Sequence, residues 1–178
     1  QVFSKSILKK TQLNFNIIGE DINGEGQVIN RIKQLKSLIQ QSHVNHISVK
    51  ISTLYSQINE THWDHAKNII AERLKDLYRE ANRLNYKKTK PTMITLDMES
   101  YSDLHISVDV FKTVLEQPEF KSTYSGIVLQ AYLPDTYAIQ QDLTLWAYQR
   151  VKNGGAPIRI RLVKGANLAM ESFESFQK

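Results

Sequence analysis

The sequence predicts an α/β fold, a (βα)8 barrel of the TIM type that is incomplete in this chain. Short apolar and β-branched runs recur about every 30 to 45 residues, and apolar residues at helical spacing follow each run, which indicates consecutive strand–helix units and a parallel sheet. No run is followed by a glycine fingerprint of the dinucleotide type, which favours a closed barrel over an open sheet. Eight units usually need about 250 residues, so we expect about five in a chain of 178.

The first unit follows a polar, aperiodic stretch. We therefore expect residues 1–12 to be an arm or linker and residues 13–178 to form the partial barrel. The first strand is expected over residues 13–20, and it ends at Glu20. Apolar residues at helical spacing then predict an amphipathic helix, and they are Val28, Ile32, Leu35, Leu38 and Ile39.

The second unit has a lysine inside its strand. Residues 46–54 form an apolar run in which Lys50 is embedded, an unusual choice for a hydrophobic strand. Thr61 can cap the long helix that follows. The apolar stripe of this helix consists of Trp63, Ala66, Ile69, Ile70, Leu74, Leu77, Ala81 and Leu84.

The third and fourth units follow the same plan. We expect strands over residues 91–99 and 126–132, and helices over residues 110–115 and 139–151. The helix breakers are Pro118 for the first of these helices and the pair Gly154–Gly155 for the second.

The fifth strand, residues 158–163, is expected to be buried on both faces because Ile158, Ile160, Leu162 and Val163 are β-branched or apolar. It brings Arg161 and Lys164 to a turn at Gly165. Apolar residues at helical spacing then predict a further helix, and the first of them are Met170, Phe173 and Phe176.

Polar residues end all five strands: Glu20, Lys50, Asp97 with Glu99, Gln130, and Arg161 with Lys164. The carboxyl ends of parallel strands meet at one edge, where α/β proteins place their active sites. Two cations at the end of a buried strand are costly unless they meet an anion, such as a phosphate, a carboxylate or an electron-rich cofactor ring. The alternative is an ion pair inside the fold.

Composition narrows the function classes. The net charge of +5 is scattered along the chain, so nucleic acid is not an expected partner. No run of about 20 apolar residues predicts a membrane helix, and the absence of Cys excludes thiol chemistry, both of which agree with a cytoplasmic protein. Two histidine pairs, His43 with His46 and His62 with His65, lack a third ligand, so no metal site is expected.

Two chemistries suit the lysines and the arginine at the strand ends. Lys50 or Lys164 could form a Schiff base with a carbonyl substrate, as in barrel aldolases. That chemistry does not explain Arg161 and Gln130, whose charge and hydrogen-bond donors suit an electron-rich ring and its phosphates.

Five ordered motifs carry a resemblance to a known family. They are residues 18–20 (IGE), 48–52 (SVKIS), 96–101 (LDMESY), 128–132 (VLQAY) and 159–166 (RIRLVKGA). The chain resembles the proline dehydrogenase domain, most closely the branch found in bacterial bifunctional proline utilization A (PutA) proteins. This resemblance implies a distorted (βα)8 barrel with FAD at its carboxyl face. It also implies oxidation of L-proline to Δ1-pyrroline-5-carboxylate, the first step of proline catabolism to glutamate, with hydride transfer from proline C5 to flavin N5.

The resemblance also implies roles for particular residues. Arg161 lies next to flavin N5, Gln130 hydrogen-bonds the isoalloxazine, and Lys50 meets the proline carboxylate. Asp97 and Glu20 orient the substrate-side groups. The residues implied to line the cofactor are Val163, Lys164, Gly165 and Ala166. The chain departs from many members at Asn167–Leu168, and it stops before the paired arginines that the family uses for the substrate carboxylate.

The implied partners are a quinone or other electron acceptor, reached from the cytoplasm or peripherally at the inner membrane, and a C-terminal aldehyde dehydrogenase domain in a longer polypeptide. We expect the isolated fragment to be inactive, and either to self-associate through unpaired strand edges or to be the ordered part of a longer polypeptide. The alternative function is a non-catalytic structural fragment in which Arg161, Lys50 and Asp97 neutralise one another.

Overall fold

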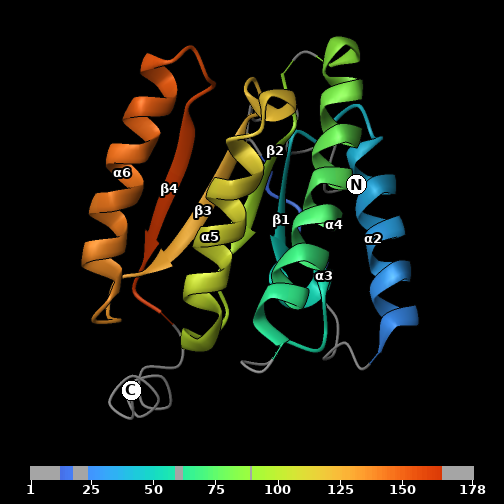
Figure 1. Cartoon of the computed structure of the whole chain (residues 1–178). Helices are drawn as coiled ribbons and strands as arrows, with labels where there is room; N and C mark the ends of the chain where they lie inside the picture. The colour runs from blue at the N-terminus through green and yellow to red at the C-terminus, as the bar shows by residue number, and fades with distance from the viewer. Residues whose placement is uncertain (1–12, 18–23, 59–61, 89, 166–178) are drawn as a thin grey trace.

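A parallel sheet with helices on one face forms the body of the chain (Figure 1). The computed structural model describes residues 13–17, 24–58, 62–88 and 90–165. Within these residues, four strands lie in the order of the sequence: β1 (His46–Lys50), β2 (Met93–Asp97), β3 (Ser125–Gln130) and β4 (Ile158–Val163). The main helices are α2 (Glu25–Ile39), α4 (Trp63–Leu84), α5 (Leu104–Leu115) and α6 (Thr136–Lys152).

The order of the strands identifies the kind of sheet. A doubly wound sheet reverses its strand order and carries helices on both faces. Here the order β1-β2-β3-β4 never reverses, and α2, α4, α5 and α6 cover the same face (Figure 1). The α/β class and the arrangement of an incomplete (βα)8 barrel are therefore as the sequence predicts.

The two faces of the sheet differ in polarity because side chains alternate along each strand. The helix-covered face carries apolar residues that are at most 1% exposed: Ile47, Val49, Ile94, Leu96, Ile127 and Leu129. The register places polar residues together on the opposite face, with Ser48 beside Thr95 and Lys50 beside Asp97. On β1 and β2, the face without helices thus carries polar side chains from its middle to its carboxyl edge.

Several of the expected strands are shorter in the structure: β2 spans residues 93–97 instead of 91–99, and β3 ends at residue 130 instead of 132. Of the strand predicted over residues 13–20, the described part contributes one parallel bridge, between Phe15 and Ile47, and Glu20 lies outside the described residues. β1 ends at Lys50 instead of continuing to Leu54, since residues 51–54 form the short helix α3 (Ile51–Leu54). Lys50 therefore ends its strand and is not embedded within it.

β4 corrects a second expectation, because it is not buried on both faces. Leu162 is 56% exposed and Arg159 is also exposed. Within the described sheet β4 pairs only with β3, and α6 buries only Thr136 and Leu143. The residues expected to start the next helix, from Met170, lie outside the described part of the chain, as does Thr61.

The helix ends follow their breakers. α5 is followed by the 3-10 turn η4 (Pro118–Phe120), and α6 by Gly154, whose φ of 78° suits glycine. The Gly154 and Gly155 backbone N–H groups donate to the carbonyls of Val151 and Arg150 at 2.9 and 2.8 Å. The chain thus turns sharply from α6 into β4.

Candidate active site

The carboxyl edge of the sheet gathers most of the residues that the sequence singled out. Lys50, Asp97, Gln130 and Val163 are the last residues of four neighbouring strands. Arg161 lies two residues before the end of β4, opposite Val128 of β3. Four polar residues that are far apart in the sequence are therefore brought to one edge by the strand order alone.

Arg161 and Asp97 form the first ion pair of this edge. An Nη atom of Arg161 donates to Asp97 Oδ1 at 2.9 Å, and the Asp97 side chain is 20% exposed. The Arg161 Nε atom is buried and has no hydrogen-bond partner among the described residues. A buried guanidinium donor without a partner is costly, so Arg161 is suited to receive an additional acceptor.

Lys50 and Glu99 form the second ion pair. Lys50 Nζ donates to Glu99 Oε1 at 2.7 Å, and Ser52 Oγ of α3 donates to Glu99 Oε2. The sequence showed Glu99 only as a charge near a strand end, and its link to Lys50 was missed. The register places Lys50 opposite Asp97. Nothing in the sequence shows that the Lys50 side chain contacts Glu99 and not Asp97.

Gln130 lies beside these ion pairs and is 4% exposed. Its Nε2 donates to the backbone carbonyl of Glu99 at 3.4 Å. Since a carbonyl only accepts, this contact fixes which end of the amide faces Glu99. Glu99 thus contacts residues that follow or end both neighbouring strands.

The turn after β4 depends on a close approach of Tyr132 to Gly165. Gly165 has a φ of 110°, and a Cβ built on it would lie 1.3 Å from Tyr132 Cε1. Only glycine fits against this ring. Of the other residues predicted to line a cofactor, Lys164 is exposed, Val163 is half-buried, and Ala166 lies outside the described residues.

His46 is a polar residue of the uncovered face that the sequence reading took only as half of a histidine pair. His46 Nε2 and Thr95 Oγ1 lie 2.8 Å apart and hydrogen-bond. Burial, followed by the charges of Arg159 and Arg161, lowers the pKa of His46 to about 4, although Asp97 acts in the opposite direction. At neutral pH His46 is therefore an uncharged member of this face.

Two further findings concern metal binding and membrane helices in the described residues. Among them, no group of three His, Asp or Glu side chains could hold a metal ion. His43 instead contacts the Phe15 ring and His65 the Tyr55 ring, both edge-on. The helices of the described part also include none that is long and apolar enough to cross a membrane.

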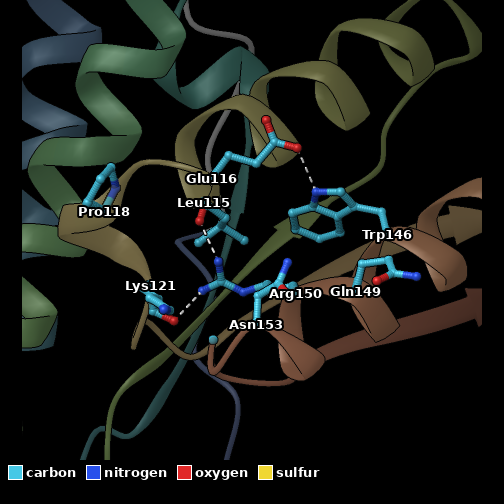
Figure 2. Close-up of a pocket in the computed structure, with 9 residues that line it drawn as sticks. Leu115, Glu116, Pro118, Lys121, Trp146, Gln149, Arg150 and Asn153 are labelled. Carbon is cyan, nitrogen blue, oxygen red and sulfur yellow. Dashed lines mark hydrogen bonds between the residues drawn. The ribbon is translucent and has the colours of Figure 1, made fainter.

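A cavity of about 480 Å³ lies at the opposite, amino edge of the sheet (Figure 2). Its residues come from the ends of α5 and α6, and Trp146 Nε1 donates to Glu116 at 2.8 Å. Arg150 in this cavity donates to the backbone carbonyls of Leu115, Phe120, Lys121 and Ala156. Because all three of its nitrogens donate to carbonyls, Arg150 acts as a structural clamp, and the carboxyl edge remains the candidate site.

The comparisons with known proteins agree with this arrangement. The family model described as proline dehydrogenase matches residues 3–178. A comparison with curated proteins found no match. The chain is similar to the solved structure of PutA from Corynebacterium freiburgense, with 38% identity and a TM-score of 0.89 over 98% of this chain and 18% of that one.

Two further solved structures extend the similarity. PutA from Bdellovibrio bacteriovorus, inactivated by N-propargylglycine, is 31% identical with a TM-score of 0.82, over 99% of this chain and 20% of that one. PutA from Bradyrhizobium japonicum, at 23% identity and a TM-score of 0.75, supports the fold alone. The chain spans at most 20% of the length of these structures. Because the family model covers nearly all of its residues, the chain belongs to the proline dehydrogenase family.

Proposed function

We propose that this chain supplies part of the barrel of an FAD-dependent enzyme that oxidises L-proline to Δ1-pyrroline-5-carboxylate, the first step of proline catabolism to glutamate. The observation that carries the proposal is Arg161, which is paired with Asp97 at the carboxyl edge and keeps a buried Nε donor without a partner among the described residues. Membership of the proline dehydrogenase family supports the substrate.

The residues present fit the flavin. Arg161 offers a fixed cation and an unused donor to an electron-rich ring, and Gln130 offers a buried amide beside it. Gly165, held against Tyr132, lets the backbone approach a ligand closely. The remaining residues proposed to line the cofactor are Val163, Lys164 and Ala166.

The residues of this chain would position the substrate and hold its charges. When bound, FAD would supply the oxidant, a ring that can accept a hydride from proline C5. Lys50 would bind the proline carboxylate with its ammonium group. Asp97 would fix the guanidinium of Arg161, and we assign Glu20 to the same substrate side. Such fixed charges stabilise a transition state because they need no reorganisation during the reaction.

The complete polypeptide would carry additional parts. We propose residues 1–12 as an arm or linker and residues 13–178 as part of the barrel. A C-terminal aldehyde dehydrogenase domain and a quinone acceptor, met in the cytoplasm or at the inner membrane surface, complete the bifunctional enzyme. The chain covers about a fifth of the length of the PutA structures, which supports a larger polypeptide.

Proline-dependent reduction of a dye acceptor by the complete polypeptide tests the proposed function. We expect turnover with L-proline and none with glycine, which has no ring to oxidise. Bound FAD without any proline-dependent dye reduction would contradict the substrate assignment.

One observation favours the non-catalytic alternative, in which the charges merely neutralise one another. Lys50 pairs with Glu99 and Arg161 with Asp97, so these four charges sum to zero. An absorbance spectrum of the purified complete polypeptide separates the two functions, because a structural ion-pair network needs no flavin. The aldolase-like alternative would instead show covalent trapping of a carbonyl compound at Lys50 or Lys164 by borohydride.

A further inference from the structure

Glu99 connects the residues that end the strands on both sides of β2. Its carboxylate receives Lys50 Nζ at 2.7 Å and the Ser52 hydroxyl, while its backbone carbonyl receives Gln130 Nε2 at 3.4 Å. Glu99 thus joins a residue proposed for substrate binding to one proposed for the cofactor, although neither the motif positions nor the strand ends assigned it a role.

Lys50 pairs with Glu99 and not with Asp97, its neighbour in the sheet. Lys50 lies directly opposite Asp97 in the register of β1 and β2, so Asp97 is its neighbouring carboxylate across the strands. Its ammonium instead contacts Glu99, two residues further along the chain, while Asp97 receives Arg161. Each carboxylate therefore holds one cation, and Lys50 is drawn past the end of its strand.

The pair between Lys50 and Glu99 contributes little to stability. The two side chains are 41% and 27% exposed, and ion pairs with such access to water contribute at most about 1 kcal/mol. A lysine side chain, however, has several rotatable bonds, and fixing them upon ligand binding costs affinity. A contact that already fixes the ammonium removes part of that cost.

We propose that Glu99 is a positioning residue that holds the Lys50 ammonium in place for the substrate carboxylate, with Ser52 holding the far oxygen of Glu99. This inference rests on the proposed function. Because Gln130 contacts the Glu99 backbone, a change in the Glu99 side chain separates the two links: it alters Lys50 and leaves the cofactor-side contact in place.

The variants for the test are Glu99→Gln, which removes the charge and keeps the shape, and Ser52→Ala, which removes only the hydroxyl. The control is Glu119→Gln, because Glu119 forms an ion pair with Arg79 on the outer surface, at 2.7 and 2.9 Å. All are made in the complete polypeptide.

Steady-state kinetics with L-proline then distinguish positioning from other roles. For Glu99→Gln we expect KM to rise about tenfold and kcat to stay within about twofold of the parent, because binding and not the chemical step is affected. Ser52→Ala should raise KM about threefold, and Glu119→Gln should not change it. The dissociation constant of cyclopentanecarboxylate, which has the ring and the carboxylate but no nitrogen to oxidise, should rise by the same factors, with an unchanged flavin spectrum.

A second measurement does not depend on proline oxidation. The rate at which an N-hydroxysuccinimide ester of acetic acid labels Lys50, followed by mass spectrometry, should rise about threefold or more in Glu99→Gln, because the amine is no longer held, and should stay unchanged in Glu119→Gln. Absence of proline turnover in the parent would overturn the proposed function while this labelling still tests the positioning. Unchanged labelling and unchanged KM in both Glu99→Gln and Ser52→Ala, or a fall in kcat alone, would overturn the inference.

Discussion

Two arginines at opposite edges of the sheet use their donors in different ways. At the amino edge, Arg150 donates from Nε and both Nη atoms to four backbone carbonyls. Figure 2 shows the contacts with Leu115 and Lys121. At the carboxyl edge, Arg161 donates to Asp97 and keeps a buried Nε without a partner in the described part of the chain. The first arginine thus completes the fold, and we propose that the second binds a ligand.

The lysines of the two edges show the same contrast. Lys88, near the amino edge, donates from Nζ to the carbonyls of Ile39 and Val44 at 2.5 and 2.6 Å, whereas Lys50 at the carboxyl edge contacts the carboxylate of Glu99. Burial lowers the pKa values of Lys88 and Arg150. Cations that satisfy carbonyls stabilise a fold, while cations paired with one carboxylate can offer their other donors to another anion. This division matches the barrel rule that places stability at the amino face and catalysis at the carboxyl face.

Of the substitutions proposed here, replacement of Arg161 should have the largest effect. It should lower the rate of proline oxidation and leave stability nearly unchanged. We expect Arg161→Met to lower kcat for proline oxidation at least about 100-fold, as the loss of one preorganised donor typically does, with a small change in thermal stability. Arg159→Met, on the same strand and exposed, is the control and should keep most of the activity. Equal losses in both variants, measured by dye reduction, would remove the distinction between the two residues.

Replacing Arg150 should have the opposite result: stability should fall, and activity should be kept. Arg150→Met leaves four carbonyls without their donor, and we expect the free energy of unfolding to fall by about 2 to 3 kcal/mol, because water recovers part of the lost hydrogen bonding. Denaturant unfolding measures the loss. The folded fraction should retain the flavin and the kcat of the parent. A stable Arg150→Met protein with lost activity would contradict the structural role.

The sequence largely predicts which residues reach the carboxyl edge, because the carboxyl ends of parallel strands meet at one edge. Lys50, Asp97, Gln130 and Arg161 end or nearly end apolar runs, so a parallel sheet brings them together. The pairing of Lys50 with Glu99 was not predictable, since it depends on side-chain rotamers that no pattern encodes.

Burial was also only partly predictable from the sequence. The composition of β4 predicts a strand covered on both faces, but coverage depends on which elements pack there, and Leu162 is exposed. In the sequence His46 is half of a histidine pair, whereas in the structure it lies opposite Met93 in the register and its side chain hydrogen-bonds Thr95.

A smaller change at Gly165 tests whether the carboxyl edge requires an accurate turn. Gly165→Ala places a Cβ in the Tyr132 ring and forces a side chain into a positive φ, so we expect FAD to be retained about tenfold more weakly and the unfolding free energy to fall by about 1 to 2 kcal/mol. Gly26→Ala is the matched control, because its Cβ would meet no atom within 4 Å. Fluorescence of released flavin after dilution measures retention, and identical release from both variants would show that the Tyr132 contact is irrelevant to the cofactor.

The smallest expected effect is the pH dependence of stability that comes from His46. Because the pKa of His46 is lowered in the folded protein to about 4 from an ordinary value of 6.5, its neutral form stabilises the fold above pH 6.5, and this contribution is lost as the pH falls toward 4. His46 is half-buried, so solvent screening reduces the loss to about 1 kcal/mol. His46→Gln should lack this part of the pH dependence. Denaturant unfolding at pH 7 and pH 4.5 checks it, and parallel losses in parent and variant would contradict the assignment.

The most direct test of the two-edge account is anaerobic mixing of the complete polypeptide with L-proline while the oxidised-flavin absorbance is followed. We predict that proline bleaches this absorbance in the parent and in Arg150→Met, and that Arg161→Met, although loaded with FAD, bleaches at least about 100-fold more slowly. Equal bleaching in the two variants, or no bleaching of the parent by proline when dithionite reduces its flavin, would contradict the account.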